Sequence, residues 1–110
     1  MAITVNIYYT GENGAAKKFA QEMCSTGVVE AIRAEEGNLR YEYFLPLENE
    51  ETVLLIDSWK DQQSLDFHHA SPMMETITRL REKYDLHMQV ERYVSQPPAA
   101  APQDDRFIRK

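Results

Sequence analysis

The sequence of 110 residues contains a single cysteine, Cys24, one tryptophan and only four glycines. One cysteine excludes an intrachain disulfide and any metal site built from several cysteines. No apolar run approaches the roughly 20 residues that a helix needs to cross a bilayer, and the N-terminus lacks the charged-then-apolar pattern of a secretory signal. These absences predict a cytoplasmic chain with no membrane partner.

Basic residues are also scarce, since 12 Lys and Arg against 18 Asp and Glu give a formal net charge of -6. Nucleic-acid affinity depends on clustered cations, so this balance argues against a nucleic-acid partner. The three histidines, His68, His69 and His87, lack a convincing ligand spacing, and no Gly-rich dinucleotide fingerprint occurs. We therefore expect no metal and no cofactor. The many acidic residues, among them Glu35 and Glu36, are expected to be solvated.

What the sequence does contain is a regular order of strand-like and helix-like segments, at a length typical of one domain. Strands are predicted at residues 2–10, 38–49, 52–59 and 86–94, and helices at 15–36 and 61–84. This β-α-β-β-α-β order predicts the α+β class and a ferredoxin-like fold, a four-stranded antiparallel sheet with both helices on one face. The domain is expected to span residues 1–95, followed by a Pro/Ala-rich tail at 96–110.

Both predicted helices contain an internal break. The stretch "CSTG" at residues 24–27 weakens the first helix, which is expected to be kinked or in two parts. In the second helix, we expect Ser71 to cap and Pro72 to begin a new helix, because proline at the first helical position loses no hydrogen bond. The phase change at this break leaves open which of His68 and His69 points inward, and the other should point outward.

The third predicted strand is apolar on both faces, with Val53 and Leu55 on one side and Leu54 and Ile56 on the other. The helices cover only one face of the sheet, so the second face would be an exposed apolar patch. A second copy of the chain is the expected cover, which predicts a homodimer through the sheet face. In the alternative, the C-terminal tail covers the sheet of its own subunit. By default the Pro- and Ala-rich tail is expected to be solvated. Docking on the partner subunit stays open, because the closing "RFIRK" has two apolar residues among three basic ones.

The motifs between the third strand and the second helix resemble those of the antibiotic biosynthesis monooxygenase (ABM) family. The chain has Trp59 and then "DQQSLDFHHASP", with His68 three positions before "SP", and it has "RAEEGNLRYEYF" leading into the second strand. The resemblance extends over residues 2–95 and implies a homodimeric α+β barrel. The family includes cofactor-independent quinol monooxygenases, enzymes that process the autoinducer-2 signal, and haem-degrading proteins. Haem-degrading relatives carry Trp where this chain has His68 and His where it has Thr78, so haem degradation is not expected.

Position by position, the resemblance implies that His68, Trp59 and Asn6 are catalytic and converge on a pocket between sheet and helices. His68 would act as the base, and Asn6 or a tyrosine hydroxyl would hydrogen-bond the developing oxyanion. The predicted substrate-binding residues form the walls of this pocket and are Tyr8, Tyr43, His69, Met73 and Ile77. Without a cofactor the substrate must supply the electrons to O2, as a deprotonated quinol does. The predicted activity is therefore cofactor-independent monooxygenation of a small quinol-like or polyketide-like aromatic.

Two other interpretations stay open. An isomerase or lyase acting on a small phosphorylated metabolite would use His68 to move a proton, and it would need Arg or Lys at the pocket mouth. The candidates for that role are Arg40, Arg79 and Arg81. A non-catalytic small-molecule-binding or stress-response dimer would instead have a closed cavity, filled by Met and Tyr side chains.

Overall fold

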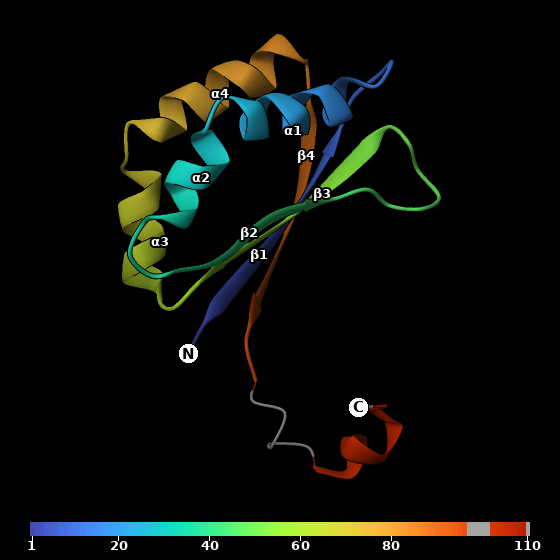
Figure 1. Cartoon of the computed structure of the whole chain (residues 1–110), viewed down its shortest axis with the longest axis vertical. Coiled ribbons are helices and arrows are strands. Elements are labelled where there is room, and N and C mark those ends of the chain that lie inside the picture. Colours follow the sequence, from blue (N-terminus) through green and yellow to red (C-terminus); the bar gives the residue numbers. More distant parts are fainter. Residues whose placement is uncertain (97–101, 110) are drawn as a thin grey trace.

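A computed structural model describes residues 1–96 and 102–109 of the chain. Within them, a four-stranded antiparallel sheet of order β2-β3-β1-β4 is covered on one face by α-helices (Figure 1). The elements are, in chain order, β1 (Ile3–Thr10), α1 (Ala15–Ser25), α2 (Val28–Arg33), β2 (Asn38–Phe44), β3 (Thr52–Trp59), α3 (Gln62–His69), α4 (Met73–Lys83), β4 (His87–Val94) and the 3-10 helix η2 (Pro102–Phe107). The predicted ferredoxin-like fold is confirmed.

The register of the strands decides which side chains meet the helices. Leu55 of β3 lies opposite Ile7 of β1 and Tyr43 of β2, and Val90 of β4 lies opposite Ile7 on the other side. Because side chains alternate between faces along a strand, the odd-numbered residues of β1 and β3 face the helices and the even-numbered ones face away. Tyr41 and Tyr43 of β2 face the helices too, and the register of β2 shifts between Asn38 and Arg40. The core on the covered face is formed by Ile3, Tyr9, Phe19, Met23, Val29, Ile32, Tyr41, Leu55, Trp59, Leu65, Ile77 and Leu80.

Strand β2 is shorter than predicted. The alternating pattern continues through Leu45 and Leu47, yet the strand ends at Phe44, and Leu45 and Leu47 are 57% and 100% exposed. Pro46 lies between them, and a proline has no N–H to donate to a strand ladder. The alternation after Phe44 is therefore not used in the sheet.

Both predicted helix breaks are present. Gly27, at a φ of 85° that favours glycine, separates α1 from α2, and α2 ends at Arg33 rather than at the predicted residue 36. At the second break α4 begins at Met73, with Pro72 as the preceding cap residue. The predicted capping by Ser71 is wrong, because its hydroxyl is buried without a hydrogen-bond partner. The turn is held instead by the backbone N–H of Met74, which donates to the Ser71 carbonyl at 3.2 Å.

None of the helices among the described residues is long and apolar enough to cross a membrane. The tail is described only in part, since residues 97–101 and 110 lie outside the described residues. In the described part of the tail, Phe107 and Ile108 are exposed apolar side chains. Docking of the tail on a partner subunit and the domain boundary at residue 95 stay predictions.

Candidate functional site

His68 is the inward-pointing histidine of the pair. Its residue is 2% exposed, and its Nδ1 lies 2.7 Å from Oε2 of Glu35. His69, the next residue on α3, is exposed, with its ring centroid 5.8 Å from that of His68. Leu65, one turn earlier on α3, is also buried and shares the inward face. The prediction that one imidazole points in and the other out is confirmed.

Glu35 is the residue of this site that the sequence did not predict. It was expected to be solvated, but its side chain is only 11% exposed because it reaches His68 from the loop between α2 and β2. Gly37 fixes this loop against α3: at its φ of 86°, an added Cβ would lie 2.2 Å from Oγ of Ser64. The Lys60 backbone N–H also donates to the Gly37 carbonyl at 2.8 Å. The glycine therefore permits the close approach that brings Glu35 to His68.

Trp59 links His68 to a second buried carboxyl group. The His68 ring stacks on the fully buried Trp59 indole, with centroids 4.8 Å apart and planes 26° from parallel. The indole Nε1–H donates to Oδ1 of Asp57 at 2.6 Å, and Asp57 is 4% exposed. Glu35, His68, Trp59 and Asp57 thus form a continuous polar and aromatic cluster that joins the α2–β2 loop, α3 and β3.

Burial controls the protonation of this cluster. It raises the pKa of Asp57 to about 7, with the Trp59 hydrogen bond opposing the rise and the Glu35 charge adding to it. Burial also lowers the pKa of His68, against the Glu35 carboxylate, which favours the charged imidazolium. A carboxyl group that holds its proton near neutral pH and an imidazole that resists protonation can coexist in one water-poor cluster.

Asn6 and Tyr8 do not join this cluster. Asn6 pairs with Ile56 and Tyr8 with Leu54, so both belong to the face of the sheet that the helices leave uncovered. The expected convergence of Asn6 with His68 and Trp59 is therefore wrong, because strand alternation turns position 6 away from positions 5 and 7. On its own face, Asn6 has a buried Oδ1 without a hydrogen-bond partner.

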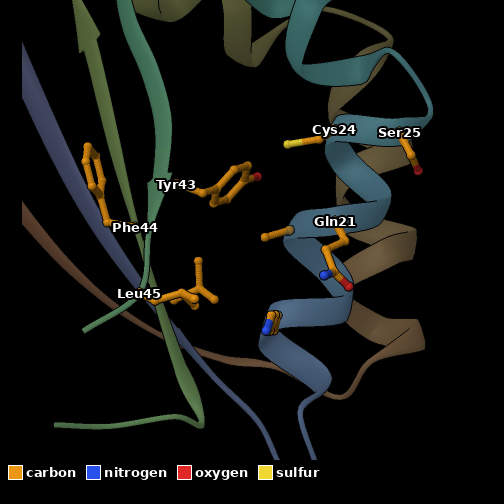
Figure 2. Close-up of a pocket in the computed structure, with 9 residues that line it drawn as sticks. Gln21, Cys24, Ser25, Tyr43, Phe44 and Leu45 are labelled. Atoms are coloured by element: carbon orange, nitrogen blue, oxygen red, sulfur yellow. The ribbon is translucent and has the colours of Figure 1, made fainter. Parts of the chain in front are cut away.

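A pocket of about 450 Å³ opens between α1 and the β2 side of the sheet (Figure 2). Its lining residues come from α1, β2, β3 and the residue after β2, and are Lys17, Ala20, Gln21, Cys24, Ser25, Tyr43, Phe44, Leu45 and Val53. Figure 2 shows the Tyr43 ring extending from β2 toward Gln21 and Cys24 of α1. The Tyr43 hydroxyl is buried and makes no close hydrogen bond, and burial raises its pKa, with the neighbouring Tyr41 hydroxyl opposing the rise. The pocket thus has a buried, protonated hydroxyl in a mostly apolar wall.

The predicted site residues are divided between this pocket and the core. Tyr43 lines the pocket, whereas Met73 and Ile77 of α4 pack against the core cluster that contains Trp59. Tyr41 connects the two places, since its ring centroid lies 5.9 Å from that of Tyr43 and 6.3 Å from that of His68. The structure therefore places Tyr43 at the pocket and His68 behind Tyr41.

Metal ligands do not gather anywhere in residues 1–96 and 102–109, where no group of three or more His, Cys, Asp or Glu side chains is placed to hold an ion. Cys24 is a free thiol on the exposed side of α1 and lines the pocket. The polar side chains in the pocket lining are Tyr43, Gln21, Ser25, Cys24 and Lys17. The Ser25 hydroxyl already donates to the Glu22 carbonyl at 3.4 Å.

Two comparisons of the sequence with known proteins both find monooxygenases. Residues 2–80 match the family model described as "Antibiotic biosynthesis monooxygenase". A 42-residue stretch is 38% identical to the "Putative monooxygenase YcnE" of Bacillus subtilis, and it covers 38% of this chain and 44% of that protein. The matched region thus spans less than half of the relative's length.

Solved structures of similar shape support the fold. A "putative antibiotic biosynthesis monooxygenase" from Deinococcus radiodurans superposes with a TM-score of 0.74 at 17% identity, over 88% of this chain and 94% of that chain. SnoaB of Streptomyces nogalater, described as a cofactor-independent oxygenase, superposes with a TM-score of 0.71 at 11% identity, over 87% and 94% of the two chains. At these identities the likeness establishes the fold alone.

Proposed function

Because the chain belongs to the antibiotic biosynthesis monooxygenase family, we propose that it is a cofactor-independent monooxygenase that oxidises a small quinol-like or polyketide-like aromatic with O2. The pocket between α1 and β2 is the proposed substrate site. The observation that carries this proposal is the buried Tyr43 hydroxyl in the pocket wall, which has the Tyr41 hydroxyl as a neighbour but donates no close hydrogen bond of its own. An unpartnered buried hydroxyl has a free-energy cost of about 1–3 kcal/mol, which a hydrogen bond to a ligand oxygen would recover.

The proposed chemistry uses Tyr43 as a hydrogen-bond donor. Its raised pKa keeps the hydroxyl protonated at neutral pH, so it can stabilise a substrate phenolate and favour loss of the phenol proton to water at the open mouth. A phenolate gives electrons to O2 far more readily than a phenol. The reaction balances without another reductant: a hydroquinone and O2 yield a hydroxyquinone and water. One oxygen atom enters the ring, the other leaves as water, and the substrate supplies all four electrons.

His68 has a different place in this proposal from the one that the sequence predicts. A general base must be within about 3 Å of the proton that it takes, directly or through one water, and His68 is not among the residues that line the pocket. We therefore assign His68 and Glu35 to positioning: they hold α3 and Trp59 beside the tyrosines. A catalytic role of Asn6 or Trp59 stays a prediction.

The test is O2 uptake by chelator-treated protein with a panel of hydroquinones and hydroxylated naphthalenes. We expect uptake that survives chelation and falls about 100-fold in Tyr43→Phe, as for the loss of one oxyanion donor. His68→Ala should lower uptake, because α3 and Trp59 would no longer be held beside the tyrosines. His69→Ala, at the exposed neighbouring position, is its matched control. If no compound supports uptake, or if Tyr43→Phe is as active as the wild type, the proposal fails.

A homodimer through the uncovered sheet face completes the proposed assembly. This face carries the half-buried Leu54 and Ile56 at its centre, and the buried Oδ1 of Asn6 there lacks a partner. A second copy would remove the apolar side chains from water, as the sequence predicts. Sedimentation at micromolar concentration should give a dimer, and Ile56→Arg should give a folded monomer. Leu47→Arg, in the fully exposed loop, should remain dimeric, and a wild-type monomer would contradict this assembly.

The structure favours the monooxygenase over the other two interpretations. A phosphorylated metabolite needs Arg or Lys at the pocket mouth, and the lining of the Tyr43 pocket contains one such residue, Lys17, and none of the candidates Arg40, Arg79 and Arg81. A non-catalytic dimer was expected to have a closed cavity, whereas this pocket is open.

A further inference from the structure

The pocket between α1 and β2 has one charged residue in its lining, Lys17. Lys17, Gln21 and Cys24 follow the four- and three-residue spacing of one helix face. Figure 2 shows that Cys24 lies on the side of α1 that faces Tyr43, with its thiol directed toward the tyrosine ring. Lys17 is therefore at the N-terminal end of the α1 wall, and Cys24 is near its other end.

The Lys17 ammonium is available to a ligand. Lys17 is exposed, and within the described residues it forms no ion pair, whereas Lys60 pairs with Glu36 and Lys83 with Glu22. Water screens a single charge on an open surface strongly, but an apolar wall beside the charge reduces that screening. An anionic group at this end of the pocket would thus be attracted to Lys17, and no acidic side chain of the described residues already pairs with its ammonium.

We propose that the substrate is an aromatic hydroxy acid whose carboxylate pairs with Lys17 while its hydroxyl accepts a hydrogen bond from Tyr43. The inference rests on the proposed function, since it names the substrate class of the same pocket. Along α1, Lys17 lies about 6 Å before Gln21 and about 10 Å before Cys24 at 1.5 Å per residue. Two or three fused rings span that length and would separate the two polar groups.

The charge of the site fits a monoanion better than a phosphate ester. Proteins usually bind phosphate groups through a helix N-terminus or through arginines. The pocket lining contains no arginine. At the N-terminus of α1 the Gly14 N–H is already within 3.3 Å of Oε1 of Glu51, so a carboxylate of the chain occupies that position. One lysine and one tyrosine hydroxyl match one carboxylate and one phenolic oxygen.

The experiment measures binding rather than turnover. The affinities of 6-hydroxy-2-naphthoate, 2-naphthol and 2-naphthyl phosphate are determined by calorimetry for the wild type, Lys17→Gln and Lys18→Gln. Lys18 is exposed and adjacent but does not line the pocket. Lys18→Gln therefore removes the same positive charge as Lys17→Gln without changing the pocket lining. We expect Lys17→Gln to weaken the naphthoate roughly 3- to 10-fold at low salt and less at 1 M salt. It should leave 2-naphthol unchanged, and Lys18→Gln should affect neither.

The outcomes separate this inference from the proposed function. Equal weakening of the naphthoate by both substitutions would overturn the inference, because only net charge would then matter. Tighter binding of the naphthyl phosphate than of the naphthoate would overturn the carboxylate assignment. If 2-naphthol binds and Lys17→Gln has no effect on any probe, the pairing of Lys17 with a carboxylate is wrong, but the pocket remains the substrate site. If no probe binds, both the inference and the proposed substrate site fail.

Discussion

Replacing Asp57 with asparagine should stabilise the protein, and the gain should grow with pH. Asp57 is buried on the helix side of β3, and its carboxylate accepts a hydrogen bond from the Trp59 indole N–H at 2.6 Å. An asparagine side chain keeps an oxygen that can accept this hydrogen bond. It removes the ionisable group that burial disfavours when it is charged.

The size of the effect follows from the shifted pKa. Burial raises the pKa of Asp57 from its ordinary 3.8 to about 7 in the folded chain. Between these values the folded state keeps a proton that the unfolded state has lost, so this residue lowers the free energy of unfolding by about 1.4 kcal/mol for each pH unit. The contribution is fully favourable below about pH 4. Above pH 7 the loss reaches about 4 kcal/mol, which Asp57→Asn should recover.

The assay is urea unfolding followed by circular dichroism at pH 5, 6 and 7, for the wild type and Asp57→Asn. The difference in unfolding free energy between the two proteins should grow by about 3 kcal/mol from pH 5 to pH 7. Comparing two proteins cancels the titration of residues that they share, such as His68. Asp66→Asn, at an exposed position on α3, controls for the loss of one negative charge. A difference that does not change with pH would refute the argument from burial.

The remaining predictions concern the parts that hold His68. His68→Ala should lower the free energy of unfolding by about 3 kcal/mol, because Glu35 would be left buried without its partner; calorimetry that shows no loss would contradict this. Because burial lowers the pKa of His68, the unfolded chain takes up a proton first as the pH falls below about 6.5, so wild-type stability should decline there and more than in His68→Ala. Gly37→Ala should cost about 2 kcal/mol or more through its positive φ and the contact with Ser64, whereas Gly14→Ala, with nothing within 4 Å, should show the strain alone. Equal costs at the two glycines in thermal unfolding would argue against close packing at Gly37.

Local patterns in the sequence were sufficient for the fold. The two-residue period of the strands, the glycine at position 27 and the proline at position 72 each act within a few residues of themselves, so they could be interpreted without the structure. The ends of the elements were less predictable. In β2 the alternation of apolar residues continues past Phe44, where the strand ends, because Pro46 has no N–H for the strand ladder.

The candidate site was less predictable because its contacts are distant in sequence. Glu35 and His68 are 33 positions apart, and no local pattern distinguishes Glu35 from its solvated neighbour Glu36. Gly37 was a usable signal only in retrospect, since its close approach to Ser64 is a tertiary contact. For Asn6, the family resemblance predicted a place beside His68, whereas the two-residue period of β1 places Asn6 on the uncovered face of the sheet. The structure agrees with the period. Burial of a single hydroxyl, that of Tyr43, cannot be inferred from strand alternation alone.

The most direct test of the central claim is a turnover under ¹⁸O2 with chelator-treated protein and a hydroquinone that supports oxygen uptake. Mass spectrometry of the product should find one labelled oxygen atom per molecule, with the second atom in water, and Tyr43→Phe should form this product about 100-fold more slowly. A product whose new oxygen carries no label, or a labelled product formed equally fast by Tyr43→Phe, would contradict the account of a cofactor-independent monooxygenase with its substrate site at Tyr43.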